Sequence, residues 1–422
     1  MMNRRDFLAI SGGLTLSTLA APACAISESP RKRLAVVTTS WRYRTHAWHM
    51  AERFLAGYPR QGRWHMPSID VVSAYVDQRP DDDLSPGRAK EFGFTVYPTV
   101  AEALRCGGDK LDVDAVLLIG EHGDYPLNEF GQKQYPRYEL FSQIVDVFRK
   151  DGRTTPVFND KHLSWKFEWA KEMVDTSKQM GFPLLAGSSL PVTWRMPSVE
   201  MPDNAPIEEA LVVAYGATDV YDFHALETLQ CMMERRAGGE TGVRSVQALK
   251  GEAVWTAMGT AKNTDGCSRR LFEACLSRSQ TLAQGESFSH RYPTPSQMRE
   301  WVKEPIAYRI EYNDGTRATM LLMNGLVTDF TFAAKLKGQR DPLSTLFYLP
   351  PNPNVAYSAA LMENAEKMFM TGKAPYPVER TLLTSGLVEA GLHSLAKGQQ
   401  RLPTPHLAIN YRPSKESTFW RR

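Results

Sequence analysis

Between residues 34 and 190 the sequence alternates short apolar runs with stretches of helical periodicity, and this alternation constrains the fold more than any other feature. The apolar runs are LAVVTTS (34–40), IDVVSAYVD (69–77), FTVYP (94–98), VDAVLLIGEHG (113–123), PVFNDKH (156–162) and FPLLAGSSL (182–190). Strands that alternate with helices form a parallel sheet with right-handed crossovers. The sequence therefore predicts an α/β domain over 31–195, a Rossmann-like doubly wound fold in which Thr99 caps a helix.

The second half of the chain follows a different pattern. Residues 309–336 alternate with period two and contain the turn sequences Asn313-Asp314-Gly315 and Asn324-Gly325. Such turns supply the positive φ angles that tight hairpins need, so an antiparallel meander is expected. Helical periodicity returns over 357–370 and 378–398. We predict an α+β domain over 196–413 with an open, mostly antiparallel sheet, followed by a tail over 414–422.

The N-terminus has the features of an export signal. Asn3-Arg4-Arg5-Asp6-Phe7-Leu8 is a twin-arginine pattern, and a weakly apolar run leads to Ala23-Cys24-Ala25, a cleavage site of the A-x-A kind. The apolar run is too short to span a bilayer. We therefore expect a signal peptide over 1–25 and a periplasmic or extracellular protein, with lipidation of Cys24 as an alternative. Twin-arginine export carries folded proteins, so a cofactor inserted in the cytoplasm would travel with the chain.

Composition excludes several classes of function. With 50 Lys and Arg against 47 Asp and Glu, the net charge is +3 and no basic block stands out, which argues against nucleic-acid or membrane-surface binding. The cysteines beyond the signal have no paired metal-ligand spacing. We expect Cys106, Cys231, Cys267 and Cys275 to be buried thiols.

Polar side chains gather where the predicted parallel strands end, which is where such sheets bind ligands. The residues at these ends are Thr38, Thr39, Ser40, Arg42, Arg44, His46, His49, Asp77, Glu121, His122, Asp124, Asp160, Lys161 and His162.

The chain resembles the Gfo/Idh/MocA oxidoreductases (glucose–fructose oxidoreductase, inositol dehydrogenase and relatives). The resemblance rests on TVAEAL (99–104), VDAVLLIG (113–120), the NDK triplet (159–161), DFHALETL (222–229) and the change to an open antiparallel sheet. It implies hydride exchange between NAD or NADP and a hydroxyl-bearing carbon of a sugar, cyclitol or derivative. It also implies catalysis by Lys161 with His224 as acid/base, a weaker role for Asp222, and a homo-oligomer formed through the open sheet.

The turn after the first strand departs from the dinucleotide fingerprint, because no glycine occurs between Val36 and Gly57. Glycines let the backbone approach a pyrophosphate closely, and bulky residues at 41–44 occupy that space. In their place, the hydroxyls of Thr38 and Ser40 and the guanidinium groups of Arg42 and Arg44 are expected to contact phosphate. Asp77 is at the position of a ribose-binding acid. The remaining expected cofactor-binding residues are Glu121, His122 and Asp160.

Two alternatives need no nucleotide. His46 and His49 share a helix face, and together with His122, His162 and the nearby carboxylates they provide ligand types for a divalent metal, as in a metal-dependent hydrolase or lyase. The second alternative is a non-catalytic sugar-binding protein in which aromatic side chains stack on the sugar. The aromatic residues concerned are Trp41, Tyr43, Trp48 and Trp64.

Overall fold

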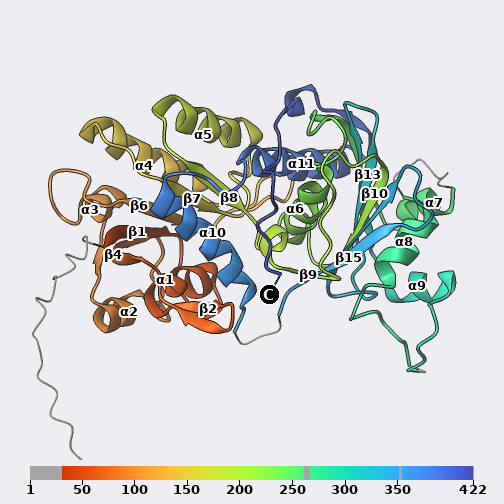
Figure 1. Ribbon diagram of the computed structural model, residues 1–422, viewed down its shortest axis with the longest axis horizontal. Helices are drawn as coiled ribbons and strands as arrows, with labels where there is room; N and C mark the ends of the chain where they lie inside the picture. The colour runs from red at the N-terminus through yellow and green to blue at the C-terminus, as the bar shows by residue number, and fades with distance from the viewer. Residues whose placement is uncertain (1–30, 261–266, 287, 351–353, 422) are drawn as a thin grey trace, which may run out of the picture. The chain divides into compact units, whose positions relative to one another are not determined.

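The structure, a computed structural model, describes residues 31–260, 267–286, 288–350 and 354–421. The described residues from Lys32 onward form one compact unit. The predicted twin-arginine signal and Cys24 lie outside the described residues. Within the compact unit, two sheets are each flanked by helices (Figure 1).

The first sheet is fully parallel over the described residues, in the order β5-β4-β1-β6-β7-β8. Its strands are β1 (Lys32–Thr38), β4 (Ile69–Val76), β5 (Thr95–Tyr97), β6 (Ala115–Ile119), β7 (Val157–Asp160) and β8 (Leu184–Gly187). Every residue of β6 is buried, as its apolar sequence requires. This order confirms the predicted doubly wound arrangement, in which the chain reverses its direction of travel across the sheet between β1 and β6.

Helices and a small hairpin connect these strands. They are the π-helical turn η1 (Ala47–Ala51), α1 (Glu52–Ala56), α2 (Ser85–Phe92), α3 (Val100–Arg105), α4 (Arg137–Asp151) and α5 (Phe167–Met180), with the hairpin of β2 (Tyr58–Arg60) and β3 (Arg63–His65). Thr99 caps α3 by accepting a hydrogen bond from the backbone N–H of Glu102, as predicted. Gly152 and Gly181 end α4 and α5 in the left-handed conformation, which costs glycine little.

One helix from the second half packs on the first sheet. Helix α10 (Tyr357–Thr371), drawn in blue, lies among the red and orange N-terminal elements (Figure 1). Its buried Leu361 and Phe369 share a hydrophobic cluster with Val36 of β1 and Phe54 of α1. The core of the first sheet therefore includes residues far beyond position 195.

The second sheet has the order β16-β11-β12-β13-β10-β14-β15-β9. Its strands are β9 (Trp194–Met196), β10 (Ile207–Ala214), β11 (Val243–Lys250), β12 (Ile306–Tyr312), β13 (Arg317–Leu322), β14 (Phe330–Leu336), β15 (Leu343–Tyr348) and β16 (Leu402–Pro403). The mostly antiparallel sheet is confirmed, but the meander prediction is wrong in one respect. Strand β10 lies between β13 and β14 and pairs in parallel with β13, because the Asn324-Gly325 turn does not close a hairpin.

Helices lie on both faces of this sheet. Helices α6 (Tyr221–Met233) and α11 (Glu379–Ala396) pack on one face. The opposite face shares a hydrophobic cluster with α7 (Glu252–Thr260), α8 (Arg269–Leu276) and α9 (Pro295–Trp301). Part of the face expected to be open is thus covered within the chain. The short 3-10 turns are η2 (Leu190–Val192) and η3 (Pro405–Leu407).

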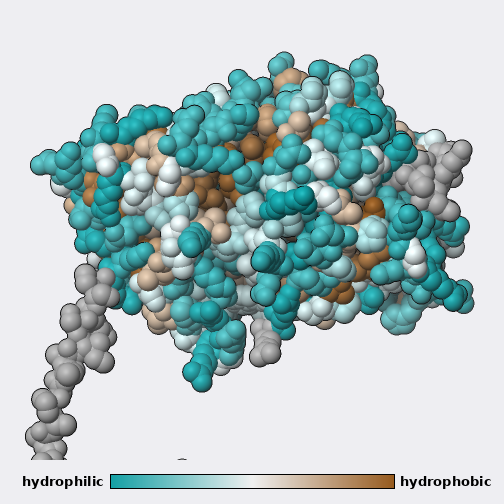
Figure 2. Space-filling model, turned by 45° about the horizontal axis from the view of Figure 1, so that its top comes forward, coloured by the Kyte–Doolittle hydropathy of each residue, from teal (hydrophilic) through white to brown (hydrophobic). Residues whose placement is uncertain are grey.

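The described surface is mostly polar on the face drawn in Figure 2. On the face in Figure 2, hydrophilic residues predominate and hydrophobic ones form scattered patches. Among the described residues, no helix combines the length and apolar character needed to cross a bilayer. Cys106, Cys231, Cys267 and Cys275 form no disulfide among the described residues, and all but Cys106 are buried, close to the prediction.

Candidate functional site

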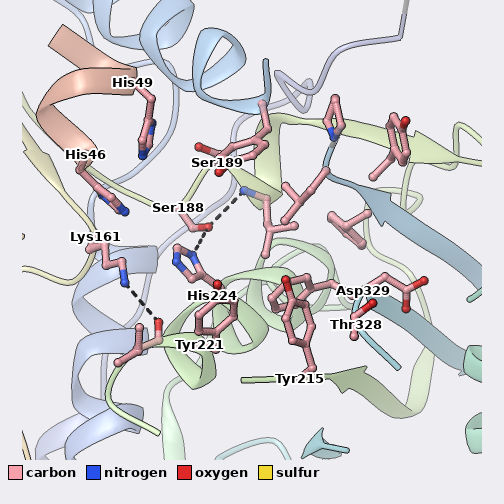
Figure 3. A pocket seen from close by; sticks show the side chains of 18 of the residues that line it. His46, His49, Lys161, Ser188, Ser189, Tyr215, Tyr221, His224, Thr328 and Asp329 are labelled. Carbon is pink, nitrogen blue, oxygen red and sulfur yellow. Dashed lines mark hydrogen bonds between the residues drawn. The ribbon is translucent and has the colours of Figure 1, made fainter. Parts of the chain in front are cut away.

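A pocket of about 480 Å³ lies where the ends of β6, β7 and β8 face α6 and the strands β14 and β15. His46, His49 and Lys161 line one end of it, whereas Tyr215, Thr328 and Asp329 line the other (Figure 3). It therefore lies at the carboxyl ends of the parallel strands, where the sequence predicts the site.

Lys161 is the central cation of the pocket. Its side chain is 3% exposed, and its Nζ atom lies 3.0 Å from Glu121 Oε1 and 3.3 Å from the carbonyl oxygen of Val220. The residue has φ of 61°, a left-handed conformation that is strained for lysine and that recurs at functional sites. Burial opposes the charge of Glu121, but Lys161 and Arg137 hold the pKa of this carboxyl well below its usual value.

His46 and Asp160 form a hydrogen-bonded pair beside Lys161. His46 Nδ1 lies 2.6 Å from Asp160 Oδ2, and the Asp160 side chain is 1% exposed. The aspartate thereby holds one ring nitrogen of His46 and leaves the other, Nε2, for the pocket that His46 lines. Asp160 Oδ1 is buried and has no hydrogen-bond partner among the described residues.

Two more imidazoles surround His46. Its ring centroid lies 4.7 Å from that of His49 and 5.0 Å from that of His122. His162, however, does not line the pocket, since it faces Arg137 at 3.1 Å. No group of three or more His, Cys, Asp or Glu residues in the described parts of the chain has a geometry suited to a metal ion. The metal-dependent alternative is therefore not supported.

His224 and Asp222 separate although they are near neighbours on α6. His224 lines the pocket, where its Nδ1 atom is 2.7 Å from Ser188 Oγ (Figure 3). Burial lowers the pKa of His224 well below its usual value. Asp222 is fully buried and accepts a hydrogen bond from Tyr308 Oη at 3.0 Å, so its carboxyl does not contribute to the pocket lining.

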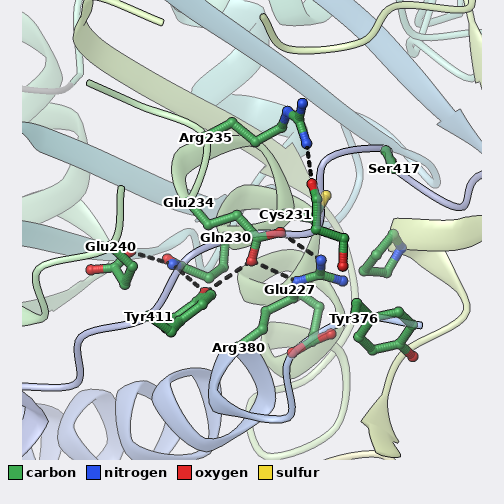
Figure 4. Close-up of polar contacts among 12 residues, drawn as sticks. Glu227, Gln230, Cys231, Glu234, Arg235, Glu240, Tyr376, Arg380, Tyr411 and Ser417 are labelled. Atoms are coloured by element: carbon green, nitrogen blue, oxygen red, sulfur yellow. Dashed lines mark hydrogen bonds and ion pairs between the residues drawn. The ribbon is translucent and has the colours of Figure 1, made fainter. Parts of the chain in front are cut away.

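A polar network holds α6, the helix that carries His224, in place. Arg380 of α11 donates to Glu234 at 2.8 Å and 2.5 Å, and Tyr411 Oη donates to the same carboxylate at 2.9 Å (Figure 4). The side chains of Arg380 and Glu234 are 8% and 2% exposed. This buried ion pair therefore joins α6, α11 and the C-terminal segment.

The residues predicted to contact phosphate do not line the pocket. The Thr38 hydroxyl donates to the carbonyl of Ile119 at 3.0 Å, and the Ser40 hydroxyl is buried without a partner among the described residues. Arg42 lies 3.7 Å from Asp82, and the Arg44 guanidinium lies over the Tyr43 ring. Of the predicted cofactor-binding residues, the pocket gathers Glu121, His122 and Asp160.

Asp77 directly follows β4, and two phenols donate hydrogen bonds to its carboxylate. It accepts hydrogen bonds from Tyr75 Oη at 2.8 Å and from Tyr125 Oη at 2.6 Å. Tyr125 belongs to the loop after β6, so this loop reaches across the end of β1. This fold is expected to bind the adenosine half of a dinucleotide over the ends of β4, β1 and β6. The residues at these strand ends do not fit it in that pose.

Most of the pocket residues that come from the second half of the chain were not predicted from the sequence. Ser188, at the end of the predicted strand 182–190, was visible as another polar strand end. The other missed residues lie far along the chain and only the tertiary fold gathers them. They are Tyr215, Tyr221, Gln280, Thr281, Thr328, Asp329, Tyr348 and Tyr357.

Acidification is expected to destabilise the protein through His122. Burial and the neighbouring His46 lower the pKa of His122 to about 4, below its usual 6.5. Between these values the unfolded chain takes up a proton that the folded chain does not, so stability present above pH 6.5 falls as the pH drops towards 4. From pH 6.5 to 5 the loss is about 2 kcal/mol.

The measurement is urea unfolding of the wild type and His122→Gln at pH 7.5 and 5.0. The variant should lose about 2 kcal/mol less than the wild type on acidification. Equal losses of unfolding free energy in both proteins would show that His122 does not cause the acid sensitivity.

Comparison with known proteins finds solved structures that share this fold but no similar sequence. No protein-family model and no curated protein matches the sequence. Among solved structures, GenD2 from gentamicin A biosynthesis, in complex with NAD, is 13% identical with a TM-score of 0.55, covering 89% of this chain and 97% of that chain. A probable dehydrogenase from Thermotoga maritima is 11% identical, with a TM-score of 0.52 and coverages of 89% and 99%.

A myo-inositol dehydrogenase from Corynebacterium glutamicum is also 11% identical, with a TM-score of 0.50 and coverages of 89% and 99%. Identities this low bear on the fold and not on the reaction. Together with the two sheets described above, they show that the chain shares the two-domain fold of these solved structures.

Proposed function

We propose that the chain is an enzyme that transfers protons on a sugar-like, carbonyl-bearing substrate in this pocket. The observation that carries the proposal is the 2.6 Å bond between His46 and Asp160, with His46 lining the pocket beside Lys161. An imidazole held by a buried carboxylate has a fixed tautomer and a free nitrogen, which is the arrangement of a general base.

The chemistry needs no group from outside the chain. His46 Nε2 takes a proton from the carbon next to the substrate carbonyl. The electron pair of the broken C–H bond forms a C=C bond, and the π pair of the carbonyl moves onto its oxygen. The Lys161 ammonium stabilises the resulting oxyanion. In an α-hydroxy carbonyl substrate, the neighbouring hydroxyl passes its proton to this oxyanion. The protonated imidazole then returns its proton to the former carbonyl carbon, which gives the aldose–ketose isomer of the substrate.

The far end of the pocket supports a polyhydroxylated substrate. Tyr215, Tyr221, Phe330 and Tyr357 offer aromatic surface, and Asp329 offers a carboxylate among hydroxyl-bearing neighbours. Pockets of this kind combine apolar walls for a sugar ring with a few convergent polar groups for its hydroxyls.

A second candidate is NAD(P)-dependent oxidation of a hydroxyl-bearing carbon, as the sequence resemblance implies. It is favoured by the fold and by Lys161, which follows β7 where the resemblance assigns a catalytic lysine. The bonds of Asp77 to Tyr75 and Tyr125 count against it.

We also propose export by the twin-arginine route, on the pattern of residues 3–8; cell fractionation with an Arg4→Lys/Arg5→Lys variant tests it.

The experiment for proton transfer is deuterium exchange. The protein is incubated in D₂O with a panel of aldoses, ketoses and uronic acids, and NMR records deuterium at carbon. Proton transfer by a positioned base contributes about 10²–10⁴-fold, so His46→Gln should lose exchange by that factor. His290→Gln, which changes an exposed histidine outside the pocket, is the matched control and should keep it. Exchange that survives in His46→Gln would refute the role of His46 as the base. A parallel incubation with added NAD or NADP tests the second candidate, which formation of reduced nucleotide would favour.

A further inference from the structure

The groove in which this fold expects a dinucleotide lies over the ends of β1 and β6, where the topology switches direction. Two segments meet there: the turn after β1 and the loop over residues 121–126, which we name the crossing loop. Thr39 Oγ1, in the turn, donates to the carbonyl of Glu121 at 2.7 Å, and the rings of His46 and His122 are 5.0 Å apart. The two segments therefore touch along the path that a pyrophosphate would take.

A buried indole belongs to the turn after β1. Trp41 is fully buried, stacks on Phe94 with ring centroids 5.8 Å apart, and donates its Nε1–H to Glu52 at 3.2 Å. Glycine at such a position lets a phosphate approach the backbone, whereas a fixed indole excludes that approach. Trp41 also belongs to the hydrophobic core of the first sheet, so its displacement would expose core surface.

The crossing loop is tied to the end of β4 by three hydrogen bonds, two with Gln78 and one with Asp77. Gln78 donates to the carbonyl of Asp124 at 2.9 Å and accepts from its N–H at 2.8 Å. Asp77 accepts from Tyr125 at 2.6 Å and from Tyr75 at 2.8 Å. Gly123 has φ of 107°, and a Cβ there would lie 2.9 Å from Gln78 and 2.7 Å from Tyr125. The loop and the end of β4 thus leave no room for a side chain between them.

We propose that the crossing loop occupies the adenosine half of the dinucleotide groove, so that the chain binds neither NAD nor NADP there, and that the loop instead holds Glu121 and His122 over the pocket. Gln78 and Tyr125 are then positioning residues: they contact no reacting atom and act through the loop. The inference concerns the same pocket as the proposed function, but it does not need that function to be correct, because both readouts below are independent of turnover.

The first test is nucleotide binding by the full chain. Titration with NADH and with NADPH, followed by nucleotide fluorescence and calorimetry, should show no saturable binding up to millimolar concentration. Protein purified after cytoplasmic expression should release no stoichiometric nucleotide on denaturation. Stoichiometric binding or release of either nucleotide would overturn the proposal, whatever the outcome of the deuterium-exchange experiment.

The second test concerns the positioning role. Gln78→Ala/Tyr125→Phe removes all three hydrogen bonds that hold the loop to the end of β4, and NMR titration of the His122 imidazole reports the result. If the loop holds His122 in its buried environment, its pKa should rise towards 6.5 by about one unit in the variant. Tyr292→Phe, at a partly exposed tyrosine outside the pocket, should leave it unchanged. An unchanged His122 titration in a folded double variant would overturn the positioning role.

Discussion

Lys161→Met should lower turnover of a pocket substrate by about 10²–10³-fold, the cost of removing one oxyanion-stabilising group. The ammonium group is buried, and its removal also leaves Glu121 with Arg137 as its remaining cationic partner. The loss should fall on kcat more than on KM, because the charge interacts most strongly with the developing oxyanion.

The measurement is the rate of deuterium incorporation at carbon, with thermal unfolding recorded in parallel. Lys171→Met is the matched control, since Lys171 is exposed and pairs with Asp175 on the surface of α5. If Lys161→Met kept more than a tenth of the wild-type rate in a folded protein, Lys161 would not act on the substrate.

Arg380→Met should destabilise the folded protein by about 3–5 kcal/mol, the usual cost of removing one partner of a buried ion pair. Glu234 would then keep its charge in the core with Tyr411 as its remaining hydrogen-bond donor in the network of Figure 4. Because Glu234 lies just after α6, the loss would also loosen the helix that carries His224.

Urea unfolding at pH 7 measures this effect. Arg149→Met, which breaks an exposed pair with Asp146 at 3.5 Å, should cost about 1 kcal/mol or less. Arg380→Met/Glu234→Leu should recover much of the stability, because it removes the uncompensated charge. A cost below 1 kcal/mol for Arg380→Met alone would show that the pair is not held as described.

Lys161 and Arg380 differ in whether their roles could be predicted from the sequence. The role of Lys161 could be predicted from the sequence, because a lysine that follows a buried parallel strand lies at the carboxyl edge of the sheet, where such sheets bind ligands. Arg380 could not, since nothing in the local sequence of α11 indicates that a carboxylate of α6 lies opposite it. Its role depends on contact between segments 146 residues apart.

The sequence by itself determined the order and type of the elements. Buried strands and amphipathic helices leave a local periodicity, and so the parallel sheet, the change to an antiparallel sheet and the strand-end positions of Lys161, Asp160 and Asp77 could be predicted. The same local rules placed Thr99 at a helix start. They failed for β13 and β14, because a turn sequence does not specify whether another strand will enter between its two arms.

Only the tertiary structure decided which contacts the residues near the strand ends make. The pairing of His46 with Asp160, the separation of Asp222 from the pocket, the return of α10 to the first sheet and the path of the crossing loop all depend on contacts between distant segments. A loop conformation follows from such contacts and leaves no periodic signal in the sequence. That is why the scaffold could be predicted from the residues, whereas the contacts of the crossing loop with Gln78 and Asp77 could not.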